Sequence, residues 1–253
     1  MAKLPNEELL EDHRPEVIQR RLARQPSSNN VSDAVLGGID GCVTTFAVVS
    51  GAYGAGFPAT VAVVLGFSNL LADGFSMAVS NYEAVKAEQD MIDNTRAMEQ
   101  RHIDEIPEGE REEVRQIFRK KGFQGDILEE IVATITRDRT LWINTMLVEE
   151  HGLRTNNLNP ARSAGVTFGA FLLVGAIPLL PYFFPQLHHQ FKFTLSAFLA
   201  ALMFFLIGII KSVHIEKPIL RSGLSTLTKG GAAAGLAYVT GYVLRELFNI
   251  GIV

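Results

Sequence analysis

The sequence predicts an all-α, polytopic membrane protein with five transmembrane helices and a cytoplasmic insert of three helices. Two observations predict this fold class. The chain has 253 residues, of which 47% are apolar, and its charged residues are gathered in blocks. The uncharged stretches between the blocks come close to or exceed the roughly 20 residues that a helix needs to cross a bilayer. A soluble domain could bury one such stretch, but not five in a chain of this length.

Five apolar segments are the predicted spans. Each holds at most two charged residues and is long enough to cross a bilayer with an ordinary tilt. In chain order they are residues 33–56, 58–80, 163–184, 193–210 and 230–250. The expected domains follow: an N-terminal arm (1–32), spans one and two (33–80), an insert (81–162) and spans three to five (163–253).

The distribution of lysine and arginine predicts the orientation. With five spans, the arm, the insert and a loop at residues 211–229 lie on the same side of the membrane. These three regions hold 21 of the 23 lysines and arginines. Cytoplasmic segments are enriched in these residues, so we expect all three regions in the cytoplasm. The arm has no apolar run behind a basic start, so we expect no cleavable signal peptide.

The insert is predicted to be helical. The helix of span two is expected to continue into it, because no Gly or Pro intervenes between the end of that span and Pro107. A second helix begins after Pro107 and ends near Gly122, a common C-terminal stop. A third helix runs from about Gly125 towards Gly152.

Composition excludes several classes of function. One cysteine, Cys42, excludes an intramolecular disulfide. A net charge of −4 gives no basis for nucleic-acid binding. The sequence shows no nucleophile paired with a base, no phosphate-binding loop and no cofactor motif. We therefore expect no enzyme activity, no bound cofactor and no ATP-driven pump.

Polar side chains inside the predicted spans indicate an ion path. An ionisable group at membrane depth costs several kcal/mol and is a functional candidate for that reason. Asp40 lies among glycines in span one, and Asn69, Asp73 and Met77 recur every four residues on one face of span two. Carboxylates suit divalent cations, and a thioether favours softer transition metals. Two plainer explanations stay open: Asp40 could make a polar contact between helices, and Met77 could be a packing residue.

Pairs of potential metal ligands recur in the insert at the spacing of one helical face. Three helices that each present such a pair can enclose a cation. Surface helices also carry acids of this kind as a solvated face, so spacing alone does not decide between the two. The pairs are Glu99 and His102, Glu110 and Glu113, and Met146 and Glu150.

With these residues in view, the sequence resembles the vacuolar iron transporter family over nearly its whole length. The order and spacing of several short motifs together make the resemblance specific. In chain order they are Gly38-Ile39-Asp40-Gly41, Gly74-Phe75-Ser76-Met77, Tyr82, Lys86-Ala87-Glu88, Pro107-Glu108, Trp142, Met146, Glu150, Gly152-Leu153 and Pro178-Leu179-Leu180-Pro181-Tyr182.

The resemblance implies a homodimer of five-span subunits, with the ion path at the dimer interface and a cytoplasmic metal-binding domain. Such proteins move iron(II), and often manganese(II), out of the cytosol in exchange for protons. By position, Asp40 and Met77 would line the path. The metal site of the insert would be formed by Glu99, Glu110, Glu113, Met146 and Glu150.

Two positions depart from the family pattern. Asn69 stands where members with a well-formed path often have glutamate, and Asp73, one turn further on the same face, is the residue that could compensate. His102 stands where the family has glutamate. Imidazole also binds iron(II), manganese(II) and zinc(II), so His102 could keep the site while changing its metal preference and pH response.

We therefore expect export of iron(II) from the cytosol by proton exchange, with manganese(II), zinc(II) and cobalt(II) as further candidate substrates. The expected location is a bacterial inner membrane or a vacuole-type organelle membrane. An alternative is a membrane-anchored metal sensor or buffer whose working part is the insert. Asp40 and Asp73 argue against it, because an anchor has no reason to bear their cost. A carrier for another solute is a third possibility.

Overall fold

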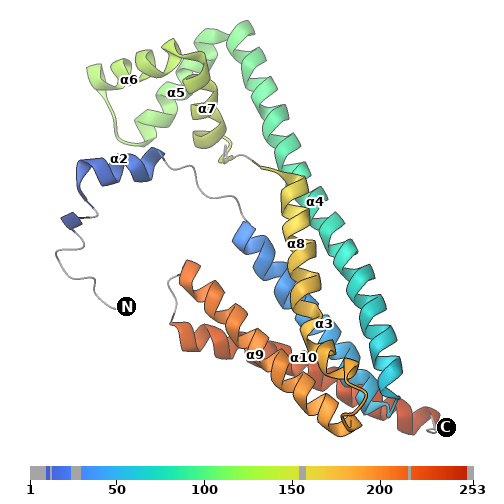
Figure 1. Ribbon diagram of the computed structural model, residues 1–253. Coiled ribbons are helices and arrows are strands. Elements are labelled where there is room, and N and C mark those ends of the chain that lie inside the picture. Colours follow the sequence, from blue (N-terminus) through green and yellow to red (C-terminus); the bar gives the residue numbers. More distant parts are fainter. Residues whose placement is uncertain (1–9, 12, 24–29, 154–157, 216–217, 250–253) are drawn as a thin grey trace. The chain divides into compact units, whose positions relative to one another are not determined.

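The computed structural model describes residues 10–11, 13–23, 30–153, 158–215 and 218–249, and these residues form helices and connections without a strand (Figure 1). The all-α prediction is therefore confirmed for the described part of the chain. The elements are α2 (Pro15–Ala23), α3 (Asn30–Gly54), α4 (Ala59–Glu105), α5 (Pro107–Lys120), α6 (Gly125–Arg137), α7 (Arg139–Glu149), α8 (Pro160–Gly175), the 3₁₀ helix η1 (Ile177–Phe183), α9 (His189–Ile215) and α10 (Ile219–Phe248).

The chain divides into two compact units. The first comprises Met1–Tyr82 and Pro160–Val253, and the second comprises Glu83–Asn159. The predicted continuation of the second helix is confirmed, because α4 runs unbroken through the division between the units. Each unit has its own apolar core.

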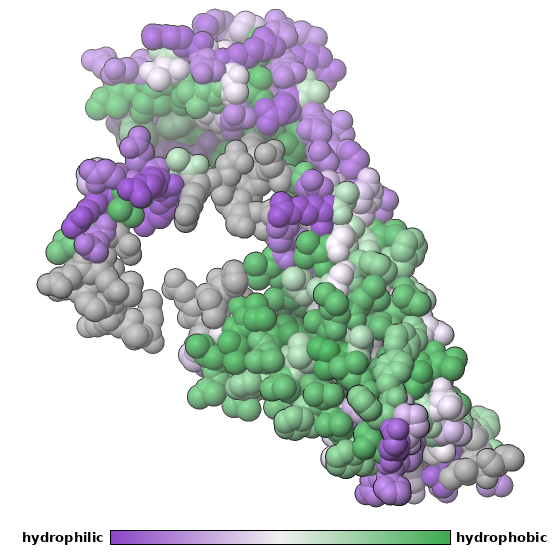
Figure 2. Space-filling view, viewed as in Figure 1, coloured by the Kyte–Doolittle hydropathy of each residue, from purple (hydrophilic) through white to green (hydrophobic). Residues whose placement is uncertain are grey.

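The first unit contains the candidate membrane spans. Among the described residues, three helices are long and apolar enough to cross a bilayer: α3, α4 and α9. The pair α8 and η1 also qualifies if the two are counted as one bent span. Helix α10 has 30 residues, but its mean hydropathy is too low for it to count among these candidate spans. Figure 2 shows hydrophobic residues over most of the visible face of these helices. The chain is thus a membrane protein with three to four candidate spans.

The predicted third span, residues 163–184, is not one continuous helix. Helix α8 ends at Gly175, and η1 follows it at an angle of 41°. Pro178 and Pro181 explain the break, because proline has no N–H to donate to the helical ladder. The freed carbonyl of Pro178 accepts a hydrogen bond from the hydroxyl of Ser196 on α9 at 2.6 Å.

The prediction of a loop at residues 211–229 is wrong, since most of that stretch is helical. Helix α9 continues to Ile215, and α10 begins at Ile219 with Pro218 as its N-cap. The first turns of α10 alternate exposed leucines with serines, threonines and basic residues. These polar residues lower the mean hydropathy of the segment. The spacing of its leucines is nevertheless compatible with the 3.6-residue period of an amphipathic helix.

Close helix packing organises the first unit. Helix α3 packs against α8, α9 and α10, as Figure 1 shows. A Cβ atom added at Gly37 would collide with the backbone carbonyl of Thr167 on α8. One added at Gly41 would collide with that of Phe171. Glycine at these two positions lets α3 and α8 approach closely, as small residues do between membrane helices.

The second unit has four helical segments instead of the predicted three. These are the end of α4, α5, α6 and α7, which enclose an apolar core. The stretch predicted as one helix from Gly125 to Gly152 breaks at Asp138, whose backbone is extended. The carboxylate of Asp138 accepts hydrogen bonds from the N–H groups of Thr140 at 2.8 Å and Leu141 at 3.1 Å. It thereby caps α7 and starts a new helix.

Candidate functional site

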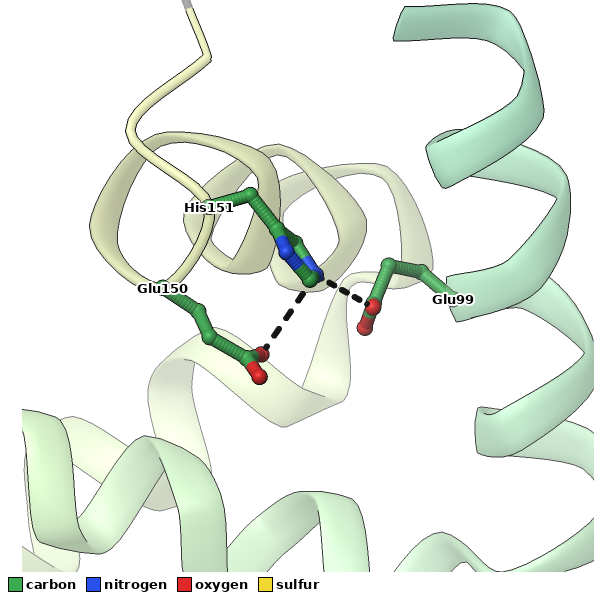
Figure 3. A group of neighbouring side chains, drawn as sticks. All are labelled: Glu99, Glu150 and His151. Carbon is green, nitrogen blue, oxygen red and sulfur yellow. Dashed lines mark hydrogen bonds and ion pairs between the residues drawn. The ribbon is translucent and has the colours of Figure 1, made fainter. Parts of the chain in front are cut away.

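Three potential metal ligands gather in the second unit at the end of α7. Figure 3 shows Glu99 projecting from α4 towards His151, with Glu150 next to it. Nε2 of His151 lies 2.9 Å from Oε1 of Glu99 and 3.7 Å from Oε2 of Glu150. One ligand atom of each residue lies within 4.8 Å of the other two. Small side-chain movements would let one cation contact all three.

The end of α7 holds Glu150 and His151 in place. The N–H groups of both residues donate to the carbonyl of Met146, at 3.0 Å and 3.2 Å. Gly152 follows with a positive φ of 66°, and the N–H of Leu153 returns to the carbonyl of Leu147 at 2.8 Å. A left-handed residue just after a helix, most often glycine, is a common way for a helix to end. It directs two consecutive side chains into the same site.

Glu110 joins the site from the first turns of α5. Its side chain is buried, and its Oε1 lies 3.3 Å from Nδ1 of His102 on α4. Burial first, and then the charge of Glu113, raise the pKa of Glu110 to about 8. The carboxylates of Glu99 and Glu150 add to this repulsion.

The same surroundings shift the pKa of Glu150. Burial and the charge of Glu113 raise its pKa, while the adjacent His151 lowers it. The carboxyl groups of Glu99, Glu110, Glu113 and Glu150 therefore interact with one another. So many carboxylates cannot all stay ionised at close range without a cation or a shared proton.

Two buried oxygens lack a hydrogen-bond donor. Oε2 of Glu99 and Oε2 of Glu110 are inaccessible to water and accept no hydrogen bond from a described residue while both groups are ionised. The two residues are 2% and 4% exposed. Buried polar atoms are normally paired, so such oxygens call for a proton or an ion. A proton on Glu110 could bridge to Glu99, and a divalent cation could bind both.

The structure brings most of the predicted insert ligands together. Glu99, Glu110 and Glu150 share the site with His102, and Glu113 reaches it electrostatically from the exposed side of α5. Met146 is fully buried in the apolar cluster with Val114 and Leu147. Its thioether packs in the core, and its role as a ligand stays a prediction.

His151 is the residue that sequence reasoning missed. The search for ligand pairs used spacings of three and four, which apply within a helix. His151 follows Glu150 directly and lies beyond the last residue of α7. A usable signal was Gly152, because a glycine stop can turn neighbouring side chains at a helix end towards one point.

The predicted path residues lie in the first unit. Asp40 on α3 and Asn69, Asp73 and Met77 on α4 are all half-buried. The carboxylates of Asp40 and Asp73 are close enough to interact electrostatically. The amide nitrogen of Asn69 is buried without a hydrogen-bond partner among the described residues.

A second polar contact in this unit joins three helices. The side-chain amide of Asn81 on α4 donates to Oδ1 of Asp33 at 3.1 Å and to the hydroxyl of Thr167 at 2.8 Å. Asp33 belongs to α3 and is 6% exposed, and Thr167 belongs to α8. The sequence placed Asp33 and Asn81 at predicted boundaries and gave no sign that they meet.

Comparisons with known proteins agree with these features. A model of the VIT family matches residues 31–242. The vacuolar iron transporter of Toxoplasma gondii is 28% identical over 228 residues, which cover 87% of this chain and 76% of that protein. Vacuolar iron transporter 1 of Tulipa gesneriana is 27% identical, with 86% and 88% covered. Vacuolar iron transporter 1 of Arabidopsis thaliana is also 27% identical, with 85% and 86% covered. The chain belongs to the VIT family, a family of transporters rather than enzymes.

Proposed function

We propose that this chain exports iron(II) from the cytosol in exchange for protons and that the second unit is its cytoplasmic metal-binding domain. The observation that carries the proposal is the pair of buried, unpartnered oxygens on Glu99 and Glu110, next to Glu150 and His151. The names of these relatives, which are vacuolar iron transporters, support iron as the substrate.

The ligand set favours borderline divalent ions. Carboxylate oxygens alone would suit magnesium or calcium, whereas imidazole nitrogen favours iron(II), zinc(II) and cobalt(II). Manganese(II) is also compatible with a site dominated by carboxylates. We propose Glu99, Glu110, Glu113 and Glu150 as oxygen ligands and His102 and His151 as nitrogen ligands. Met146 is kept as a further member of the metal site because the family resemblance implies it.

Metal binding at this site releases protons. The raised pKa of Glu110, about 8, keeps much of its carboxyl group protonated at neutral pH. An incoming divalent ion stabilises the carboxylate and displaces that proton. The second unit can thus gather metal when the cytosolic concentration rises and return it when the local proton concentration increases.

The membrane path is proposed to begin at Asp40. Asp73 lies close to it and carries the second carboxylate, which compensates for Asn69 in place of the family glutamate. Two neighbouring carboxylates can bind one divalent ion or share a proton, which suits exchange. Met77 adds a soft ligand on the same helical face as Asp73.

The proposed topology keeps five spans and a homodimer. Helix α10 has 30 residues, a length of about 45 Å that exceeds the hydrocarbon thickness of a bilayer. Helix α4 presents exposed apolar side chains, among them Val64, Leu71 and Phe75, which suit contact with lipid or with a second copy. The excess of lysine and arginine supports a cytoplasmic location for the second unit.

Transport into proteoliposomes tests the proposal. Iron(II) uptake is measured under an imposed pH gradient for the parent, for Asp40→Ala and for the control Asp93→Ala, which changes an exposed carboxylate on α4. We expect uptake by the parent and the control and its loss in Asp40→Ala. Equal uptake by the parent and Asp40→Ala would overturn the assignment of Asp40.

The alternative of a membrane-anchored buffer is distinguished in the same assay. Replacing both Glu99 and Glu110 by glutamine removes the two buried carboxylates of the second unit. A transporter keeps metal flux at saturating metal after this change, whereas a buffer loses its only function. The carboxylates of Asp40 and Asp73 favour the transporter.

A further inference from the structure

A basic cavity lies in the first unit, between the end of α9 and the beginning of α10. Its volume is about 410 Å³. Three cations and three hydroxyl groups line it, and no acidic side chain does so among the described residues. They are Lys211, Arg221, Lys229, Ser222, Ser225 and Thr226.

The three cations have no partner in the described part of the chain. Lys211, Arg221 and Lys229 make no ion pair there with an aspartate or glutamate. The cluster does not reflect a basic protein, because the net charge of the chain is −4. Like charges that converge on a cavity repel one another, and a bound anion offsets this repulsion.

The geometry of α10 suits a phosphate group. Arg221, Ser225 and Lys229 follow one another at intervals of four, so they share a helical face. A guanidinium group binds two phosphate oxygens at once, and an ammonium group adds a point charge. The hydroxyls of Ser222 and Ser225 make no hydrogen bond to another described residue and remain available as donors.

The surroundings of the cavity indicate where the phosphate comes from. Ile219, Leu220 and Leu224 on the same turns of α10 are 50%, 69% and 56% exposed. Apolar side chains so exposed next to a basic cavity are typical of a helix at a membrane surface. Lys211 is the first charged residue of α9 after the uncharged stretch of residues 193–210. These residues would therefore lie at the level of the lipid headgroups.

We propose that this cavity binds a phosphate group, carried by the headgroup of an anionic membrane lipid. The cations neutralise the phosphate, the serine hydroxyls donate to its oxygens, and the exposed leucines contact the acyl chains. Its lining residues are different from the carboxylates proposed to bind metal, and its occupant carries the opposite charge.

Lipid binding to the full chain tests this proposal. The protein is reconstituted in nanodiscs of phosphatidylcholine with increasing phosphatidic acid, and retained lipid is measured by native mass spectrometry. We expect the parent to retain phosphatidic acid in preference to phosphatidylcholine. Arg221→Gln and Lys229→Gln should each weaken this retention by about fivefold, the effect of one cation at a membrane surface.

Two variants serve as controls. Arg245→Gln removes one positive charge from the same helix, outside the cavity, and should retain lipid like the parent. Arg221→Lys keeps the charge but loses the bidentate geometry, so it should fall between the parent and Arg221→Gln. Rescue by this variant shows that a loss in Arg221→Gln reflects charge and not misfolding.

A second arm separates the two sources of phosphate. Inorganic phosphate is titrated into the protein in a neutral detergent. Competition by millimolar inorganic phosphate without any preference for phosphatidic acid supports the cavity but assigns it to a soluble phosphate. The proposal is overturned if neither probe binds, or if Arg221→Gln and Lys229→Gln bind phosphatidic acid as tightly as Arg245→Gln.

Discussion

Nε2 of His151 lies 2.9 Å from Oε1 of Glu99, although the two residues are 52 positions apart in the chain. Glu99 is buried and keeps its second carboxylate oxygen without a hydrogen-bond donor. His151 is therefore the side chain that hydrogen-bonds this carboxylate in the described structure when Glu110 is ionised. The imidazole either donates a hydrogen bond to Glu99 or, when a metal enters, offers a nitrogen ligand beside it.

Replacing His151 tests its role as a ligand. His151→Ala should weaken binding of zinc(II) and cobalt(II) by about tenfold, the loss usual for one metal-site partner. Manganese(II), which prefers oxygen, should lose less affinity. Isothermal titration calorimetry of the full chain in detergent measures the affinity for each metal. The exposed His188→Ala, in the first unit, is the matched control. An equal loss for all three metals would contradict a nitrogen ligand and indicate a structural role.

Glu110 predicts how metal binding depends on pH. Because its pKa is about 8, binding of a divalent ion near pH 6 must displace a proton from this group. We expect the affinity for zinc(II) to rise from pH 6 to pH 8 and then to level off. The same titration on Glu110→Gln should give weaker binding with a smaller pH dependence. An unchanged pH dependence in Glu110→Gln would assign the titration to another group.

The raised pKa of Glu110 also predicts how the stability of the metal-free protein depends on pH. The pKa of Glu110 is raised in the folded chain from 4.5 to about 8, so folding favours the protonated form. This contribution to stability is complete below pH 4.5 and is lost as the pH rises through about 8. Thermal unfolding in the presence of a chelator should show a Tm that falls between pH 6 and pH 9. Glu110→Gln, which cannot ionise, should show a smaller decrease.

The cap of α7 supports the site from a distance. Asp138→Ala removes the acceptor for the N–H groups of Thr140 and Leu141 and should cost about 1 kcal/mol of stability. The change should increase hydrogen exchange in α7, the helix that ends at Glu149. Asp138→Ser keeps a capping oxygen and should exchange like the parent. Equal exchange in Asp138→Ala and Asp138→Ser would show that the cap contributes nothing.

The carboxylate cluster could be predicted in part, because its spacings are local. Glu110 and Glu113 share a face of α5, and periodicity alone places them together. That His102 meets Glu110 across two helices depends on how α4 and α5 pack, and no spacing encodes it. Spacing did not identify His151 as a candidate ligand, because it lies outside a helix, where the 3.6-residue period no longer applies.

The fold was predicted where hydropathy is decisive and missed where local chemistry intervenes. The break after Gly175 follows from Pro178 and Pro181, which were visible in the sequence inside an apolar run. The break at Asp138 is likewise a capping signal within a helical pattern. The early start of α10 was hidden because its first turns combine leucine with serine and basic residues, which lowers mean hydropathy without breaking the helix.

The contact between α3 and α8 gives a final prediction. A methyl group at Gly37 would overlap the carbonyl oxygen of Thr167, which belongs to the backbone and cannot move aside. Gly37→Ala should therefore force the two helices apart and lower the Tm of the detergent-solubilised protein. Gly235→Ala on α10 is the matched control, because its added methyl group meets nothing within 4 Å. That variant should be neutral or more stable by up to about 1 kcal/mol, since alanine favours the helix. Equal Tm values for Gly37→Ala and Gly235→Ala would show that α3 and α8 are free to separate.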